Sequence, residues 1–179
     1  MERIKINDKY FKPFISNEKI EAAIIEVAEK INRDYKDSED IPVFVCILNG
    51  AFMFAGSLMK HINFQCEISF VKYSSYEGTS STGKLEKKYG LTTDIRGRKV
   101  IIIEDIVDTG MTIQGVCNDL REAGAADVKI ATLFLKPDAY KGKEIIDYKA
   151  MTIGNEFIVG FGLDYDQLGR QYKDIYIID

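Results

Sequence analysis

Apolar residues of this 179-residue chain follow two patterns, helical spacing and short uninterrupted runs. Between residues 17 and 34 they recur every three or four positions, which predicts an amphipathic helix: Ile20, Ala23, Ile24, Val27 and Ile31. Ser16 or Asn17 is suited to cap its amino end. Residues 112–123 show similar spacing, and Gly124 is suited to end that second helix.

Short apolar runs predict strands between the helices. Residues 42–48 form one such run, which ends at an Asn49-Gly50 turn, and residues 51–62 are then typical of a helix. Residues 66–73 and 128–135 are two further runs. From residue 74 to 90, glycine, serine, threonine and charged residues replace any periodicity. This segment is predicted to be a loop, of a length that is uncommon in a compact domain unless the loop is functional or disordered.

The run VIII at residues 100–103 has no polar alternation, which favours a strand buried on both faces of a parallel sheet. With helices and strands alternating around it, the chain is predicted to have an α/β fold, a mostly parallel central sheet with helices on both faces. The length suits a single domain of residues 1–179. We expect its core at about residues 17–145. A small antiparallel hood is expected from residues 1–16 and 146–179, including short runs at 150–153, 157–159 and 175–178.

Composition narrows the classes of function. The net charge of -4 disfavours general attraction to nucleic acid, and no apolar run is long enough to cross a membrane. Because the first residues lack the apolar core of a secretory signal, a cytoplasmic location is expected. Cys46, Cys66 and Cys117 lack metal-ligand spacing and are interpreted as small apolar residues. With His61 as the only histidine, acid-base chemistry must come mainly from carboxylates.

The residues after the buried strand indicate the kind of ligand. Glu104 and Asp105 are expected at the carboxyl end of the strand, the edge where open α/β sheets bind ligands. Their carboxylates can hold sugar hydroxyls or a metal ion. The amides and hydroxyls from Asp108 to Thr112 can hold a phosphate group. Together they predict a sugar phosphate as the ligand.

The array E-D-x-x-D-T-G-x-T at residues 104–112 resembles the 5-phosphoribosyl 1-pyrophosphate motif of type I phosphoribosyltransferases, in the form typical of the hypoxanthine-guanine branch. The resemblance extends from about residue 40 to 170. It includes L-N-G at 48–50, S-Y at 75–76, L-K-P at 135–137 and FIVGFGLDYDQLGR at 157–170. It implies a type I phosphoribosyltransferase fold and a purine salvage enzyme, which transfers 5-phosphoribosyl to N9 of hypoxanthine or guanine and yields IMP or GMP with pyrophosphate.

The resemblance also implies how the donor is bound. Glu104 and Asp105 would hold the ribose hydroxyls, and Asp108 would be the catalytic group that exchanges a proton with purine N7. The following loop would bind the 5-phosphate: Thr109, Gly110, Met111 and Thr112. Mg²⁺ is the expected cofactor because it would neutralise the leaving diphosphate, with Glu104, Asp105 and Asp164 as its predicted carboxylates.

Base and pyrophosphate binding are implied for residues further along the chain. Lys136 would hydrogen-bond the 6-oxo group, Phe157 would stack on the purine, and the Ile158 carbonyl would accept from the guanine amine. Asp164 would lie near the pyrophosphate, and Arg170 would bind it through its planar fork.

Two loops complete the implied site. Asn49 and Gly50 would form the pyrophosphate loop, with a cis peptide bond between Leu48 and Asn49. Ser75 and Tyr76 would belong to a lid over residues 74–90, which would protect the donor from water. The substrates expected as partners are 5-phosphoribosyl 1-pyrophosphate and a 6-oxopurine, and a homodimer or homotetramer is expected from the family, with neither nucleic acid nor membrane as a partner.

Three other classes of function share some of these features. The string V-D-T-G also occurs in aspartic proteases, but these are all-β proteins, and the helical periodicity opposes that class. A phosphoribosyltransferase-like RNA-binding regulator is disfavoured by the acidic composition. A transferase for adenine, orotate or uracil is the closest rival, and the region of Lys136 and Phe157 distinguishes it. Lys136 alone is typical of a surface residue and Phe157 alone of a core residue, so these roles depend on the resemblance.

Overall fold

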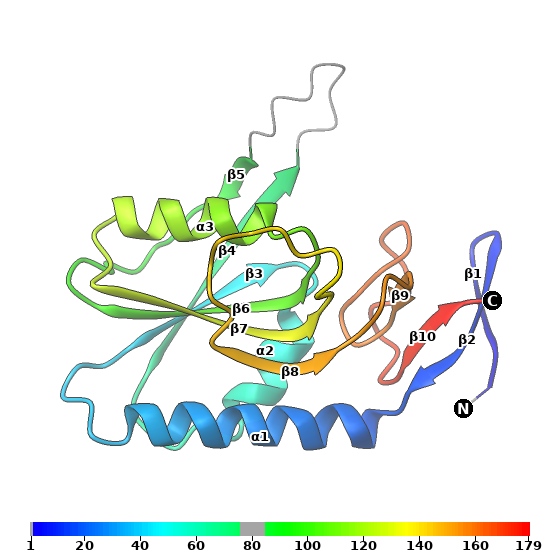
Figure 1. The fold of residues 1–179 in the computed structure, drawn as a ribbon, viewed down its shortest axis with the longest axis horizontal. Helices are drawn as coiled ribbons and strands as arrows, with labels where there is room; N and C mark the ends of the chain where they lie inside the picture. Colours follow the sequence, from blue (N-terminus) through cyan, green and yellow to red (C-terminus); the bar gives the residue numbers. More distant parts are fainter. Residues whose placement is uncertain (1, 76–84) are drawn as a thin grey trace.

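The computed structural model describes residues 2–75 and 85–179, and their strands form two sheets (Figure 1). The larger sheet has the strand order β5-β4-β3-β6-β7-β8. Strands β4, β3, β6, β7 and β8 are parallel, and β5 is antiparallel to β4. Their bounds are β3 Val43–Leu48, β4 Glu67–Ser75, β5 Leu85–Tyr89, β6 Lys99–Val107, β7 Asp127–Leu135 and β8 Tyr148–Thr152.

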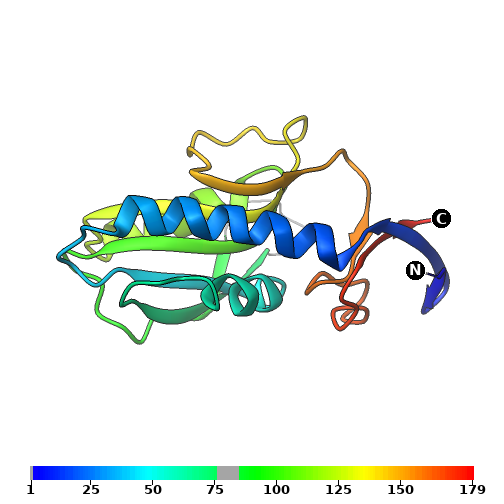
Figure 2. The ribbon, with the colours of Figure 1, turned by 90° about the horizontal axis from the view of Figure 1, so that it is seen from below.

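Helices cover both faces of this sheet, as predicted (Figures 1 and 2). Helices α1 (Asn17–Tyr35) and α2 (Phe52–Met59) lie on one face, and α3 (Met111–Glu122) lies on the other. Strand β6 supplies both sides of the core, because Ile101 and Ile103 pack in the cluster of α1 and α2 whereas Ile102 packs with α3. All three are fully buried, so the prediction of a strand buried on both faces is confirmed.

The second sheet is a small antiparallel hood with the order β1-β2-β10-β9. It joins β1 (Ile4–Ile6) and β2 (Lys9–Ile15) to β9 (Ile158–Val159) and β10 (Ile175–Ile178), so both ends of the chain contribute, as predicted. The Asp179 amide donates to the Tyr10 carbonyl at 3.0 Å. The hood lies beyond the carboxyl ends of the parallel strands (Figure 1).

Three expectations about elements were wrong. Strand β8 covers most of residues 150–153, which we expected in the hood, but it pairs with β7 in parallel in the large sheet. Strand β5 lies within the segment 74–90 that was expected to be a loop. Strand β6 continues to Val107, so Glu104 and Asp105 lie inside it and not at its end. For β5 and β6, pairing with a neighbouring strand extends regular structure beyond what the local sequence pattern indicates, and for β8 it decides which sheet the run joins.

The three cysteines lie in the core or pack against it. Cys46 and Cys117 are buried and Cys66 is partly buried, and all three are free thiols. Burial raises the pKa of both Cys46 and Cys117 to about 12, as expected for apolar core residues. Within residues 2–75 and 85–179, no helix is long and apolar enough to span a bilayer.

Candidate active site

Glu104 and Asp105 form a buried acidic pair near the carboxyl end of β6, with 6% and 9% of their surfaces exposed. The Asp105 amide donates to Glu104 Oε1 at 3.2 Å, and the Ile106 amide donates to Asp105 Oδ1 at 2.8 Å. Burial raises the pKa of Glu104, and the adjacent Asp105 charge raises it further. Burial also raises the pKa of Asp105, although hydrogen bonds and the Arg170 charge oppose this. Such a pair favours a ligand that brings hydroxyl donors or positive charge.

The loop after β3 lies directly against this pair. The peptide bond between Leu48 and Asn49 is cis, as the resemblance implied, and Asn49 is exposed. A Cβ atom at Gly50 would overlap the Asp105 carboxylate, and one at Gly162 would overlap the Gly50 carbonyl oxygen. Gly162 also has a φ of 99°, which favours glycine. Glycine at both positions therefore allows the loop after β3, strand β6 at Asp105 and the segment around Gly162 to meet at one point.

Asp108 and Lys136 meet although 28 residues separate them. Asp108 follows β6 and Lys136 follows β7, and Lys136 Nζ donates to Asp108 Oδ2 at 3.0 Å. The Lys136 side chain is 11% exposed, whereas that of Asp108 is 50% exposed. The parallel pairing of β6 with β7 brings these two ends together. The contact joins a carboxylate to an ammonium group at the edge of the sheet.

The predicted phosphate loop begins helix α3. Gly110 has a φ of 88° and precedes Met111, the first helical residue, so the unpaired amides of the first turn follow it directly. Thr109 and Met111 are exposed and Thr112 is partly buried. The amino end of an α-helix with exposed amides and hydroxyls is suited to a phosphate dianion.

Asp164 and Arg170 form an ion pair of 2.7 Å between Asp164 Oδ1 and Arg170 Nη2. Arg170 Nη1 also donates to the Gly162 carbonyl at 2.7 Å, and the Gln167 amide donates to Asp164 Oδ2 at 2.8 Å. These contacts fix the guanidinium at the segment that touches Gly50. Arg170 is thus connected to the acidic pair and to the loop after β3.

Phe157 and Ile158 belong to the hood. Phe157 is 47% exposed, and its ring lies 6.4 Å from that of Phe11 and 5.9 Å from that of Tyr165, measured between centroids. Ile158 is buried in β9 and pairs with Ile177. An exposed ring supported by two others is suited to stacking on a planar ligand.

The lid prediction is only partly covered by the described residues. Ser75 is the last residue of β4, and its backbone pairs with Leu85. Tyr76 lies outside the described residues, together with residues 77–84 of the predicted lid.

The predicted metal ligands do not form a ready-made cluster. Over residues 2–75 and 85–179, no group of three or more histidine, cysteine, aspartate or glutamate side chains could hold a metal ion. Asp164 is paired with Arg170, which leaves Glu104 and Asp105 as the buried acids. Two carboxylates fit Mg²⁺, which usually takes one or two from a protein and completes its shell with phosphate oxygens and water.

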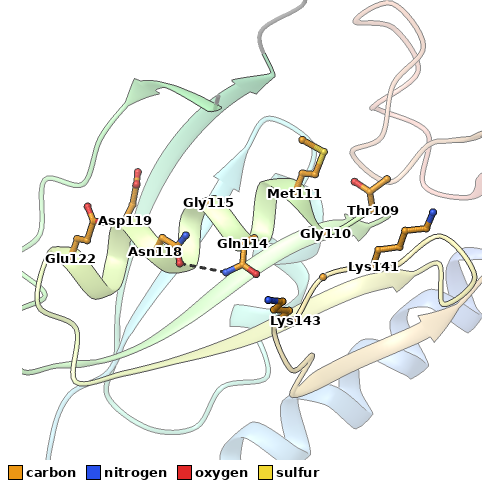
Figure 3. A pocket seen from close by; sticks show the side chains of 11 residues that line it. Thr109, Gly110, Met111, Gln114, Gly115, Asn118, Asp119, Glu122, Lys141 and Lys143 are labelled. Atoms are coloured by element: carbon orange, nitrogen blue, oxygen red, sulfur yellow. Dashed lines mark hydrogen bonds between the residues drawn. The ribbon is translucent and has the colours of Figure 1, made fainter. Parts of the chain in front are cut away.

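A cavity of about 1330 Å³ adjoins the phosphate loop and runs along α3 (Figure 3). Thr109, Gly110 and Met111 lie at one end, with Asp119 and Glu122 further along the helix. Lys141 and Lys143 line it from the loop between β7 and β8. Neither lysine was among the predicted site residues, and the K-G-K string at residues 141–143 is the signal that could have indicated this part of the loop.

The carboxyl edge of the parallel sheet thus combines a buried acidic pair, a phosphate-binding helix end and an Asp-Lys contact, opposite a hood that presents an aromatic ring. Fold and site define the class of type I phosphoribosyltransferases. Residues 14–166 match the family model of the phosphoribosyl transferase domain. The chain belongs to this family, in its hypoxanthine-guanine phosphoribosyltransferase branch.

Relatives in that branch are similar over nearly the whole chain. The hypoxanthine-guanine phosphoribosyltransferase of Streptococcus pneumoniae is 40% identical over 93% of this chain and 92% of its own length. The hypoxanthine-guanine-xanthine phosphoribosyltransferase of Tritrichomonas foetus is 34% identical over 99% and 95%. Among solved structures, a hypoxanthine phosphoribosyltransferase from Staphylococcus aureus has a TM-score of 0.87 and 33% identity over 94% of this chain and 91% of that one.

Proposed function

We propose that this protein is a purine salvage enzyme that transfers 5-phosphoribosyl from 5-phosphoribosyl 1-pyrophosphate to N9 of hypoxanthine or guanine. The bond from ribose C1 to the pyrophosphate oxygen breaks, the bond from C1 to N9 forms, and the base loses one proton. The products are IMP or GMP and pyrophosphate. The proposal is supported by the relatives described above, which share this activity by name.

The observation that carries the proposal is the 3.0 Å contact between Lys136 Nζ and Asp108 Oδ2. A 6-oxopurine presents O6 and N7 side by side on one edge. Lys136 can donate to O6 while Asp108 exchanges a proton at N7, so the base replaces an ion pair with two hydrogen bonds. Adenine has an amino donor in place of O6 and would leave Lys136 without an acceptor.

The other residues position the donor. Glu104 and Asp105 accept hydrogen bonds from the ribose hydroxyls, the loop from Thr109 to Thr112 binds the 5-phosphate, and the backbone around Gly50 with Arg170 binds pyrophosphate. Ribosyl transfer develops positive charge on the sugar in its transition state. Correct placement of the two partners and of these fixed charges lowers the barrier.

Mg²⁺ is the proposed cofactor, with Glu104 and Asp105 as the carboxylates that would hold it and Asp164 close to the pyrophosphate. When bound, the ion would neutralise the leaving diphosphate. Burial raises the pKa of both acids, and a bound cation would favour their ionised forms and so supply the compensation that burial removes.

The proposed assembly is a homodimer or homotetramer. Ile68 and Phe70 on β4 are each 38% exposed and lie in register with Phe44 and Cys46, which belong to the core under α1 and α2. They therefore present apolar surface on that face of the sheet, where a second copy could pack. A cytoplasmic location is also proposed, and it suits three free thiols.

A product assay tests this function. The protein is incubated with 5-phosphoribosyl 1-pyrophosphate, MgCl₂ and, separately, hypoxanthine, guanine, xanthine, adenine, orotate or uracil, and nucleotide formation is followed by chromatography. We expect IMP and GMP. Nucleotide formed only from adenine, orotate or uracil, and not from hypoxanthine or guanine, would assign the protein to a sister transferase. Omission of MgCl₂ with added chelator tests the cofactor.

A further inference from the structure

The loop between β7 and β8 is fastened to α3 by the carboxylate of Glu144. Arg121 donates to both of its oxygens, with Nη1 2.8 Å from Oε1 and Nη2 2.7 Å from Oε2. Gln114 Nε2 donates to Oε1 at 2.8 Å. The Glu144 side chain is 13% exposed. Arg121 holds the pKa of Glu144 below its usual range, so the carboxylate is ionised at neutral pH.

The same loop touches the phosphate loop. The Tyr140 hydroxyl donates to the Glu144 carbonyl at 2.6 Å, which fixes the tyrosine ring. A Cβ atom at Gly110 would overlap a carbon of that ring. The Lys141 amide donates to the Thr109 carbonyl at 3.2 Å. Two consecutive residues of the phosphate loop thus lie against a segment that is held in place at Glu144.

The beginning of this loop carries Lys136. The Lys136 amide donates to the Val107 carbonyl, and the Tyr140 amide donates to the Lys136 carbonyl, both at 3.0 Å. Val107 directly precedes Asp108. The segment from Lys136 to Glu144 therefore contacts the backbone on both sides of Asp108. Figure 3 shows the Gln114 side chain pointing from α3 toward this segment.

We propose that Glu144 is a positioning residue for the donor phosphate loop, acting through Arg121, Gln114 and Tyr140 without touching a ligand. The inference rests on the proposed function. Amides that bind a phosphate contribute fully only when their directions are fixed before binding, because otherwise the ligand must order them. The ring of Tyr140 limits how far Gly110 can move. The Glu144 backbone carbonyl holds that ring, and the contacts of the Glu144 carboxylate with Arg121 and Gln114 hold the carbonyl in place.

The competing interpretation is an ordinary surface ion pair, which would contribute little. The pair of Arg98 Nη2 with Glu67 Oε1 offers a matched control, since it has the same kind of partners at 2.8 Å but joins β4 to the loop before β6 at the amino edge of the sheet. A purely structural role for Glu144 predicts equal effects when either pair is removed. A positioning role predicts that only Glu144 affects donor binding.

The experiment compares Glu144→Gln, Tyr140→Phe and Glu67→Gln in steady-state kinetics, with KM measured separately for 5-phosphoribosyl 1-pyrophosphate and hypoxanthine. We expect Glu144→Gln to raise the donor KM roughly tenfold, because misdirected amides of the phosphate loop would lose the equivalent of about one charge-assisted hydrogen bond to phosphate. The hypoxanthine KM should change by less than about twofold. Tyr140→Phe should have a smaller effect of the same kind, and Glu67→Gln should leave the donor KM unchanged.

Each result bears on the inference. A donor KM that is unchanged in Glu144→Gln, or raised equally in Glu67→Gln, overturns it. If Glu144→Gln fails to fold, as judged by circular dichroism, Arg121→Lys replaces it. Lysine keeps the positive charge but cannot bind the carboxylate in a bidentate way, so this variant should raise the donor KM by a smaller factor. A wild-type protein that makes no nucleotide from any base would instead contradict the proposed function.

Discussion

At the scale of single residues, the site keeps charged groups in surroundings that do not favour them. Glu104 and Asp105 are adjacent and buried, and no cationic side chain in the described residues forms an ion pair with either. Gly50 lies so close to Asp105 that no larger residue fits without movement. In the proposed function, Mg²⁺ and the ribose hydroxyls would compensate for this less stable arrangement of two buried carboxylates.

Glu104→Gln tests this at the level of stability. Because the pKa of Glu104 is raised in the folded state, the native protein loses stability as pH rises from the ordinary carboxyl range through that raised pKa. Glutamine does not ionise. The variant should therefore melt roughly 2–4 °C higher at neutral pH, the shift produced by about 1 kcal/mol in a domain of this size, with no gain near about pH 4. Calorimetry across pH measures it, and a lower Tm at pH 8 would contradict the explanation.

Asp108→Asn tests the proton transfer. Asparagine keeps the shape of the side chain but cannot take a proton, so turnover should fall by roughly 100-fold or more while the donor KM changes little. Asp138→Asn is a matched control, since Asp138 is an exposed acid two residues after Lys136. Steady-state kinetics with hypoxanthine gives both constants. Near-normal turnover in Asp108→Asn would remove Asp108 from the mechanism.

At the scale of elements, sequence patterns predicted the helices and the central strands but not every pairing. The run from Val100 to Ile103 has no polar residue, so burial on both faces was predictable from the sequence. The sequence of β5, LEKKY, is mostly charged, as suits the edge of a sheet, and it shows no apolar alternation. Strand β8 is five residues long, and nothing in so short a segment specifies a parallel partner.

The site was predictable only in part for a similar reason. The motif identified Asp108, and resemblance identified Lys136, Asp164 and Arg170, which the structure brings together in two pairs. Glu144 was not singled out, because a glutamate in a polar loop has no distinctive pattern. Its partners come from α3 and depend on the path of the backbone, which local sequence does not encode.

Phe11→Ala tests the hood as an element. Phe11 is fully buried in β2 and lies against the rings of Phe157 and Tyr165. Its loss should destabilise the protein by about 3–5 kcal/mol and should raise the KM for hypoxanthine more than that for the donor. Tyr10→Ala, at the exposed neighbouring position of β2, is the control. If both KM values change equally, the hood has no separate role in base binding.

At the scale of the whole molecule, the proposed site residues are distributed between the two sheets. The parallel sheet carries the acids, the phosphate loop and Lys136, while the hood carries Phe157. The proposed assembly would leave this division intact, because Ile68 and Phe70 lie on the face of β4 and not at its carboxyl end. Oligomerisation and catalysis are therefore expected to use different surfaces.

Phe70→Lys tests the assembly. Burying a charged side chain in an apolar contact costs far more free energy than leaving it in water. The variant should therefore sediment as a species of half the wild-type mass or less. Ile25→Lys, which alters an equally exposed apolar residue on α1, should sediment like the wild type. Sedimentation velocity distinguishes them. An unchanged mass for Phe70→Lys would place any interface elsewhere.

The pairing of β2 with β10 has a consequence for how the protein is made. Residues 9–15 precede every strand of the large sheet in the sequence, and their partner at Ile175–Ile178 follows all of them. On a growing chain β2 can pair early with β1, but its pairing with β10 must follow synthesis of the large sheet, and contacts so distant in sequence form slowly. The large sheet, with the residues proposed to bind the donor, can thus acquire its shape on the nascent chain before the hood, with the residues proposed to bind the base, is complete.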